Sequence, residues 1–242
     1  LNNLAVDSHL QGRYVEAMQM FAEAAKYARQ AASPHRQAVV LFGQADLFAD
    51  LDLALQAAEL YGQGLVLATQ LDNTQLLRYG CVQSSVLHRR RGGVSLAHEW
   101  LRRAISLDPS GGPAPAVDIQ LAALESLVSP ARARTRLKSL LKEHGPALDA
   151  GERTLALYFL VKSAHAAEDF AEAESALEQA LSRAGGHGTE QVLAGEMAFD
   201  AQIRDFAWRR LAGNPVLSVV LHRIETMRAL AEQHRVEPAR VE

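Results

Sequence analysis

The chain has 242 residues, 48% of them hydrophobic and 22% charged, which is enough apolar material for a long buried core. Its single cysteine, Cys81, excludes an internal disulfide framework, and no run of about 18 apolar residues suggests a membrane span. No segment at the N-terminus resembles a signal peptide, so these features together predict a cytoplasmic protein.

The net charge of −3 is distributed unevenly along the chain. Residues 75–145 carry 11 basic and 5 acidic side chains, whereas acidic side chains outnumber basic ones on both sides of this stretch. A basic middle can steer an acidic partner towards the protein, although ordinary variation along a helical surface explains the same counts.

Residues 1–109 repeat themselves with a period of 40 residues. Phe21, Tyr61 and Leu101 are 40 residues apart, and an alanine lies four residues before each of them. The same spacing returns further on at Ala173 and Leu177, with Phe170 three residues before Ala173, and all these large residues are expected in the core. Small residues let two helices cross closely, and large residues fill the space between neighbouring pairs. Helix pairs repeated in this way cannot bury their own apolar faces, so they must stack into a solenoid.

Glycines, prolines and capping residues divide the chain into helices. The expected helices span residues 1–10, 14–31, 34–49, 53–71, 75–90, 94–107, 116–127, 130–144, 149–167, 169–184, 189–211 and 216–234. Ser33, Ser129 and Asp149 are the expected N-caps, and 189–211 reads as one long helix or two short ones. No segment alternates with period 2, so we expect essentially no β-strand.

Two glycine-rich stretches interrupt this pattern and are candidate hinges. Residues 110–115 contain two glycines and two prolines, and residues 185–188 contain three glycines. Since residue 1 is not methionine and lies within a repeat, we also expect that the sequence is a piece of a longer protein.

The small and large residues, with Gly12 and Gly92 at turns and Pro109 after a second helix, resemble the tetratricopeptide repeat family. The resemblance implies a right-handed all-α solenoid of helix pairs at 1–32, 34–72, 75–109, 116–144 and 149–184. Residues 189–235 depart from the pattern and are expected to form an atypical C-terminal cap. The long period is similar to that of bacterial transcription regulators of the maltose-activator type.

The same resemblance places the first helix of each pair on a concave, ligand-binding face. The side chains implied there are Asn2, Asn3, His9, Phe42, Asp46, Tyr79, Gln83, Arg89, Arg90, Tyr158, Lys162 and His165. Amides suit a peptide backbone, the two arginines suit a carboxylate or phosphate, and the aromatic rings suit apolar groups. Each of these residues can equally be an ordinary solvated or locally paired helix residue.

No pattern of residues indicates catalysis. The chain has no phosphate-binding glycine loop, no nucleophile elbow and no His-Glu-x-x-His pair, so we expect no enzyme, no cofactor and no metal site. Cys81 is expected to be buried and inert. The run His88–Arg91 lacks interleaved aromatics, so direct contact with nucleic acid is not expected. Trp208 is either the core of the cap or an anchor for a partner or second subunit.

These observations favour a protein- or peptide-binding scaffold. By resemblance, it would be the sensor or interaction domain of a bacterial signal-responsive transcription regulator. A free-standing adaptor or self-assembly scaffold is the first alternative. A receptor domain that senses a small molecule in the groove is the second.

Overall fold

The structure is a computed structural model that describes residues 1–107 and 114–236. Within these residues the chain is all-α, with thirteen α-helices, one short 3-10 helix and no β-strand. The helices are α1 (Asn2–Leu10), α2 (Tyr14–Gln30), α3 (Pro34–Asp50), α4 (Ala54–Gln70), α5 (Thr74–Arg90), α6 (Val94–Ser106), α7 (Pro115–Glu125), α8 (Pro130–Glu143), α9 (Ala150–Ala166), α10 (Phe170–His187), α11 (Glu190–Met197), α12 (Ala201–Leu211) and α13 (Pro215–Val236), with the 3-10 turn at Gly145–Ala147.

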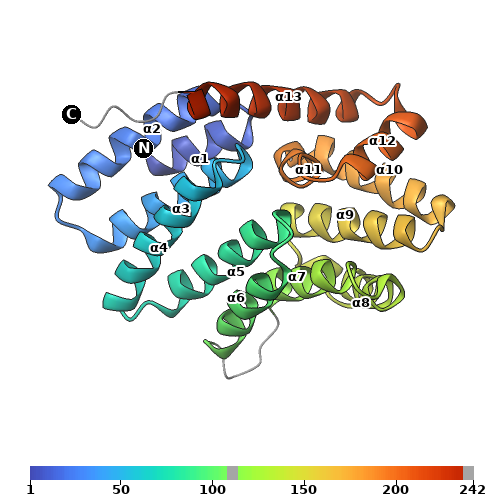
Figure 1. The fold of residues 1–242 in the computed structure, drawn as a ribbon, viewed down its shortest axis with the longest axis horizontal. Helices are drawn as coiled ribbons and strands as arrows, with labels where there is room; N and C mark the ends of the chain where they lie inside the picture. The colour runs from blue at the N-terminus through green and yellow to red at the C-terminus, as the bar shows by residue number, and fades with distance from the viewer. Residues whose placement is uncertain (108–113, 237–242) are drawn as a thin grey trace.

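The helices α1 to α10 pack as sequential antiparallel pairs, each pair against the next, which confirms a solenoid-like arrangement. The row of pairs curves, and α13 crosses back from α12 towards α1 and α2 (Figure 1). Arg223 of α13 fixes this return, because its Nη1 donates to the backbone oxygen of Leu10 at 2.7 Å. The solenoid therefore closes on itself instead of presenting an open groove.

The turns of the first five helices repeat every 20 residues, which is half of the sequence period. Gly12, Ala32, Asp52, Asp72 and Gly92 each follow a helix and each have a positive φ. The residue after each of them donates its N–H to the carbonyl five residues earlier, as Ser33 does to Ala28 and Gly93 does to His88. This is the Schellman ending of a helix, and it sets identical reversals between α2, α3, α4 and α5, which have 17 residues each.

Helix starts were predicted with mixed success. Asp149 caps α9 through a reciprocal capping box with Glu152, and Ser33 caps α3, as the sequence indicated. Ser129 makes no side-chain hydrogen bond at the start of α8, so its expected capping role was wrong. Pro130 at the first helical position needs no N–H partner, which reduces the need for a capping side chain there.

The repeated alanine and large residues form the core, as predicted. Phe21, Tyr61, Leu101 and Leu177 are all buried. They belong to two apolar clusters, one across α3 to α7 and a larger one that joins α1 to α3 with α7 to α13. The two ends of the solenoid thus share one core. Phe170, which was also expected in the core, is 42% exposed because it is the first residue of α10.

The glycine-rich stretch at 185–188 is not a break, contrary to expectation. Helix α10 continues through Gly185 and Gly186 to His187, and only Gly188 turns left-handed. Gly185 lies against Val216, where a built Cβ would meet Cγ2 at 2.6 Å, so close packing explains that glycine. In the other candidate hinge, 110–113 lie outside the described residues, and Pro115 begins α7. The stretch 189–211 forms two helices, α11 and α12.

The single cysteine and the apolarity of the helices were both considered from composition. Cys81 is fully buried, as predicted, and burial raises the pKa of its thiol. Within residues 1–107 and 114–236, no helix has both the length and the apolarity required to cross a bilayer.

The left-handed turn at Ala32 leads to a stability prediction. An L-residue with positive φ costs about 1–2 kcal/mol, which glycine avoids at a smaller entropic cost. Ala32 is exposed and has a φ of 45°. Ala32→Gly should therefore raise the free energy of unfolding by about 0.5–1 kcal/mol in urea titrations.

Ala31 is the matched control for this substitution, since it is also exposed but has a φ of −77°. Ala31→Gly should bring no gain in stability. Equal effects of the two substitutions would contradict the role of the left-handed turn.

Candidate functional site

The concave side of the solenoid holds a short helix from the chain's own C-terminal part. Helix α11 lies inside the curve and packs against α1, α9 and α13 (Figure 1). Its polar side chains reach residues of α2, α3 and α5 that are more than 100 positions away in the sequence. These contacts form a buried polar cluster, which we call the α11 seat: Tyr14, His9, Asp50, Arg89, Arg90, Gln191 and Glu196.

Two arginines of α5 hold Glu196 of α11. Nη2 of Arg89 lies 2.7 Å from Glu196 Oε1, and Nε of Arg90 lies 3.0 Å from the same oxygen. Glu196 is only 3% exposed. Burial alone would raise the pKa of this carboxyl, but Arg89 and Arg90 outweigh burial and lower the pKa to about 2.

Asp50 of α3 is the second carboxylate of the seat. It accepts hydrogen bonds from Arg90 Nη1 at 2.8 Å, from His9 Nε2 at 2.9 Å and from Gln191 Nε2 at 2.8 Å. Burial opposes ionisation of Asp50, yet Arg90 and His9 together lower its pKa. Tyr14 completes the seat by donating to Gln191 Oε1 at 2.7 Å. Each buried charge therefore has a partner of opposite charge or a hydrogen bond.

Gly195 allows α11 to come close to this cluster. A Cβ built on Gly195 would lie 2.7 Å from Asp50 Oδ1 and 3.0 Å from Arg90 Nη2. Asp50 has a short side chain that is held by several hydrogen bonds, so it has little freedom to move aside. A glycine at this position is thus a requirement of the seat.

A second polar group lies beside the seat on α3, α4 and α5. Tyr61 donates to Asp46 Oδ1 at 2.6 Å, and Tyr79 donates to Asp46 Oδ2. The ring of Phe42 lies 5.6 Å from that of Tyr79. Burial raises the pKa of Asp46 to about 6, in spite of the two hydroxyl donors and the nearby His9, which lower it.

A cavity of about 380 Å³ occupies the part of the concave side that α11 leaves open. The first helix of every pair contributes to its wall, together with Tyr61 of α4 and with α11. Asp46, Tyr79 and Gln83 line one side, and Glu152 of α9 lines another. Burial is the main cause of a raised pKa at Glu152; the backbone N–H of Asp149, which donates to Glu152, opposes it, and the Asp149 carboxylate adds to it.

Several of the residues expected to face a ligand are in contact with the protein itself. His9, Phe42, Arg89 and Tyr158 are buried, and Arg90 is paired with Asp50 and Glu196. Both arginines therefore match the locally paired alternative, and their binding of a separate ligand stays a prediction. The sequence could not show that α11 folds back to neutralise them.

The remaining expected residues lie in three places. Tyr79, Gln83 and Asp46 face the cavity. Lys162 pairs with Asp200 at 2.8 Å, and the His165 ring lies between Phe170 and Phe206, with centroids 5.4 and 5.1 Å away. Asn2 and Asn3 line a separate hollow at the N-terminal edge, where Asn2 Oδ1 is buried without a hydrogen bond. Of the predicted set, the structure thus brings together His9 of α1 with the α3 and α5 members.

Sequence reasoning missed the residues of α11. Gln191, Gly195 and Glu196 were assigned to a capping region and not to a site. A signal was present, because Glu196 is a lone acidic residue in the mostly apolar run 192–198. A single carboxylate in such a run indicates burial with a cationic partner.

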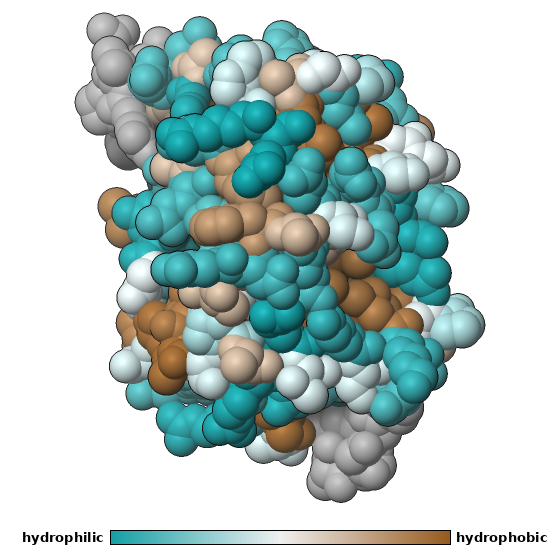
Figure 2. Space-filling view, turned by 90° about the vertical axis from the view of Figure 1, so that its right-hand side faces the viewer, coloured by the Kyte–Doolittle hydropathy of each residue, from teal (hydrophilic) through white to brown (hydrophobic). Residues whose placement is uncertain are grey.

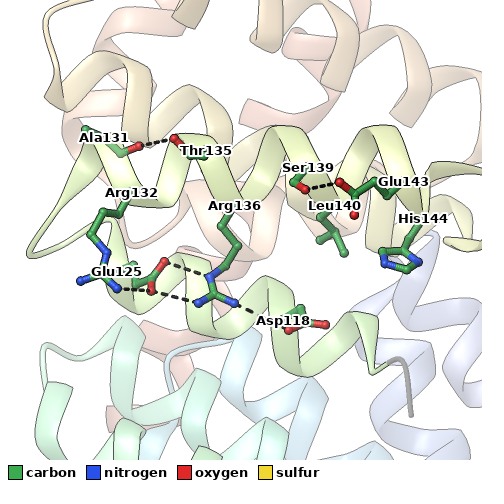
Figure 3. Close-up of a pocket in the computed structure, with 10 residues that line it drawn as sticks. All are labelled: Asp118, Glu125, Ala131, Arg132, Thr135, Arg136, Ser139, Leu140, Glu143 and His144. Carbon is green, nitrogen blue, oxygen red and sulfur yellow. Dashed lines mark hydrogen bonds and ion pairs between the residues drawn. The ribbon is translucent and has the colours of Figure 1, made fainter. Parts of the chain in front are cut away.

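A further hollow, between α7 and α8, is not a comparable site. Its polar side chains bind one another: Arg136 forms a forked pair with Glu125, and Ser139 donates to Glu143 (Figure 3). It is an exposed depression on the outside of the pair, so we assign it no functional role.

Trp208 is not the core of the cap, because its side chain is 57% exposed on α12. The interpretation as a surface anchor stays a prediction. Figure 2 shows the face on the right-hand side of Figure 1, where α12 lies, and hydrophilic residues divide its apolar surface into separate patches.

No protein-family model matches the chain, and no curated protein is similar to it in sequence. Within residues 1–107 and 114–236, no group of three or more His, Cys, Asp or Glu side chains is arranged to hold a metal ion.

Asp46 leads to a prediction about pH. Its pKa is about 6 in the folded protein against an ordinary value of 3.8, so the folded state holds the proton more tightly than the unfolded state. This contribution to stability is complete below pH 4 and is lost as the pH rises through 6. An asparagine side chain does not titrate. The free energy of unfolding of Asp46→Asn should therefore rise by about 3 kcal/mol relative to that of wild type as the pH increases from 4 to 7.

Urea unfolding at several pH values measures this difference. Asp7→Asn is the control, since it removes the same charge from the exposed side of α1. If the two variants change in the same way with pH, the proposed burial of Asp46 is incorrect.

Proposed function

We propose that the chain is a binding module built from tetratricopeptide-like pairs with a right-handed sense, and that its concave side binds a protein or peptide segment. One observation carries the proposal: the concave side already accommodates a helical segment, α11, through charged side chains. The resemblance to bacterial regulators extends the proposal to a sensor or interaction domain of a signal-responsive transcription regulator. A free-standing adaptor would use the same surface.

The chemistry of the α11 seat supports a partner that carries a carboxylate. Arginine offers several N–H donors in a planar fork that matches a carboxylate, and it keeps its charge when buried. Arg89 also lies against the Phe159 ring, 4.8 Å from its centroid, and donates to Gln120 at 3.0 Å. These contacts hold the guanidinium in place before any ligand binds, which lowers the entropic cost of binding.

A small polar ligand is the second candidate, and the cavity is the observation that favours it. Its volume of about 380 Å³ lies within the range of about 300–1,000 Å³ that small-molecule sites have. In either case the proposed function is binding, with no cofactor and no catalytic step, and Trp208 is the proposed contact for a second copy or partner.

Affinity capture from cell lysate tests the leading proposal, with this chain as the bait and with the captured proteins identified by mass spectrometry. The informative variant is Tyr79→Ala with Gln83→Ala, which alters the cavity wall and leaves the α11 seat intact. Leu55→Ala is the control, because Leu55 is 86% exposed on α4 and does not line the cavity.

A protein held by wild type and by the control, but reduced at least tenfold by the double variant, is the expected result. Equal capture by wild type, the control and the double variant would contradict binding on the concave side. If no protein is captured but native mass spectrometry finds a retained small molecule, the second candidate replaces the first.

A further inference from the structure

We propose that α11 is a displaceable occupant of the concave side, and that the partner recognised there is a short helix with an α11-like polar face. This inference rests on the proposed function, since it specifies which partner the concave side recognises. In the free chain, α11 would hold the place of the partner and keep the buried charges of α5 and α3 neutralised.

The two faces of α11 have different partners. At 100° per residue, Gln191, Gly195 and Glu196 fall within one arc of the helix. This arc faces the α3 and α5 members of the α11 seat, which are Asp50, Arg89 and Arg90. Leu193 and Met197 fall on the opposite arc and belong to the apolar cluster that includes α13. Helix α11 is therefore joined to α13 by apolar contact and to α3 and α5 mainly by hydrogen bonds and ion pairs. The same apolar cluster continues into α1, α2, α9 and α10, but α11 makes its most extensive contact with α13, so we treat these two helices as one unit.

Unfilled space flanks the contact between this unit and the first repeats. On one side lies the cavity of about 380 Å³, which Gln191 and Glu196 help to line. On the other side, a second cavity of about 300 Å³ separates Leu51 at the end of α3 from Phe199 and Met227. The contact between α11 and the first repeats is therefore bordered by open space on two sides.

The seat also specifies what can replace α11. If α11 leaves, Arg89 and Arg90 lose Glu196, and a buried charge without a partner is costly. An occupant must bring a carboxylate at this point and a residue without a side chain beside it, because Asp50 and Arg90 leave no room for a Cβ. An amide five residues before the carboxylate would replace Gln191 as a donor to Asp50. The partner is thus a short helix with Gln, Gly and Glu in the spacing of α11.

Gly195→Ala separates this proposal from a purely structural role for α11. Alanine favours a helix more than glycine does, so the helix itself gains, but the added Cβ would meet Asp50 Oδ1. All residues of the concave side that contact α11 stay unchanged. Gly62→Ala is the matched control, because Gly62 lies within α4 and has no atom within 4 Å of its built Cβ.

The probe is a fluorescent synthetic peptide with the sequence of residues 188–201, titrated into the full chain by anisotropy. In wild type and in Gly62→Ala, the attached α11 competes at an effective concentration on the order of millimolar, so the peptide should bind weakly. Gly195→Ala should bind it at least tenfold more tightly. A peptide with Glu196→Gln should lose that gain, because it cannot neutralise the arginines.

Hydrogen exchange on the same proteins makes the test decisive. The amides of α11 should exchange faster in Gly195→Ala, with those of α3 and α5 unchanged. The proposal is overturned if α11 exchanges only with global unfolding in both variants, or if α11 is released and the peptide still does not bind. Because the peptide comes from the chain itself, these results are independent of whether lysate capture finds a cellular partner.

Discussion

The arrangement of the whole molecule depends on one buried ion pair, in which Glu196 of α11 meets Arg89 and Arg90 of α5 at 2.7 and 3.0 Å. Removing both sides of such a pair can be nearly neutral for stability, whereas removing one side is costly. The pair therefore acts mainly as a constraint on position. The surface with two guanidinium groups and Asp50 satisfies the carboxylate and the amide of α11, so the C-terminal helices close over the concave side.

The fold was largely predictable because its information is local. The alanine and large residues at a 40-residue period specify helix pairs, and the residues at 12, 32, 52, 72 and 92 end helices at regular intervals. Where the predictions failed, tertiary contact was the reason. Gly185 was read as a break, but it packs against Val216, and Phe170 was read as core, but it lies at an exposed helix start.

The candidate site was less predictable, since it joins residues 106 and 107 positions apart. Arg89 and Arg90 were singled out as ligands for a carboxylate or phosphate, and the carboxylate that they contact here belongs to the same chain. A single sequence gives no distance between α5 and α11, and the period ends before α11 begins. The lone acidic residue in an apolar run was the available signal, and it indicates burial without naming the partner.

The account predicts that a carboxyl group on α11 is ionised inside the protein, and NMR titration of isotopically labelled glutamate side chains measures this directly. Glu196 should titrate with a pKa of about 2, because two buried guanidinium groups stabilise its charge. A value near the ordinary 4.5 would mean that Glu196 is solvated and that α11 does not occupy the concave side, which would contradict the account.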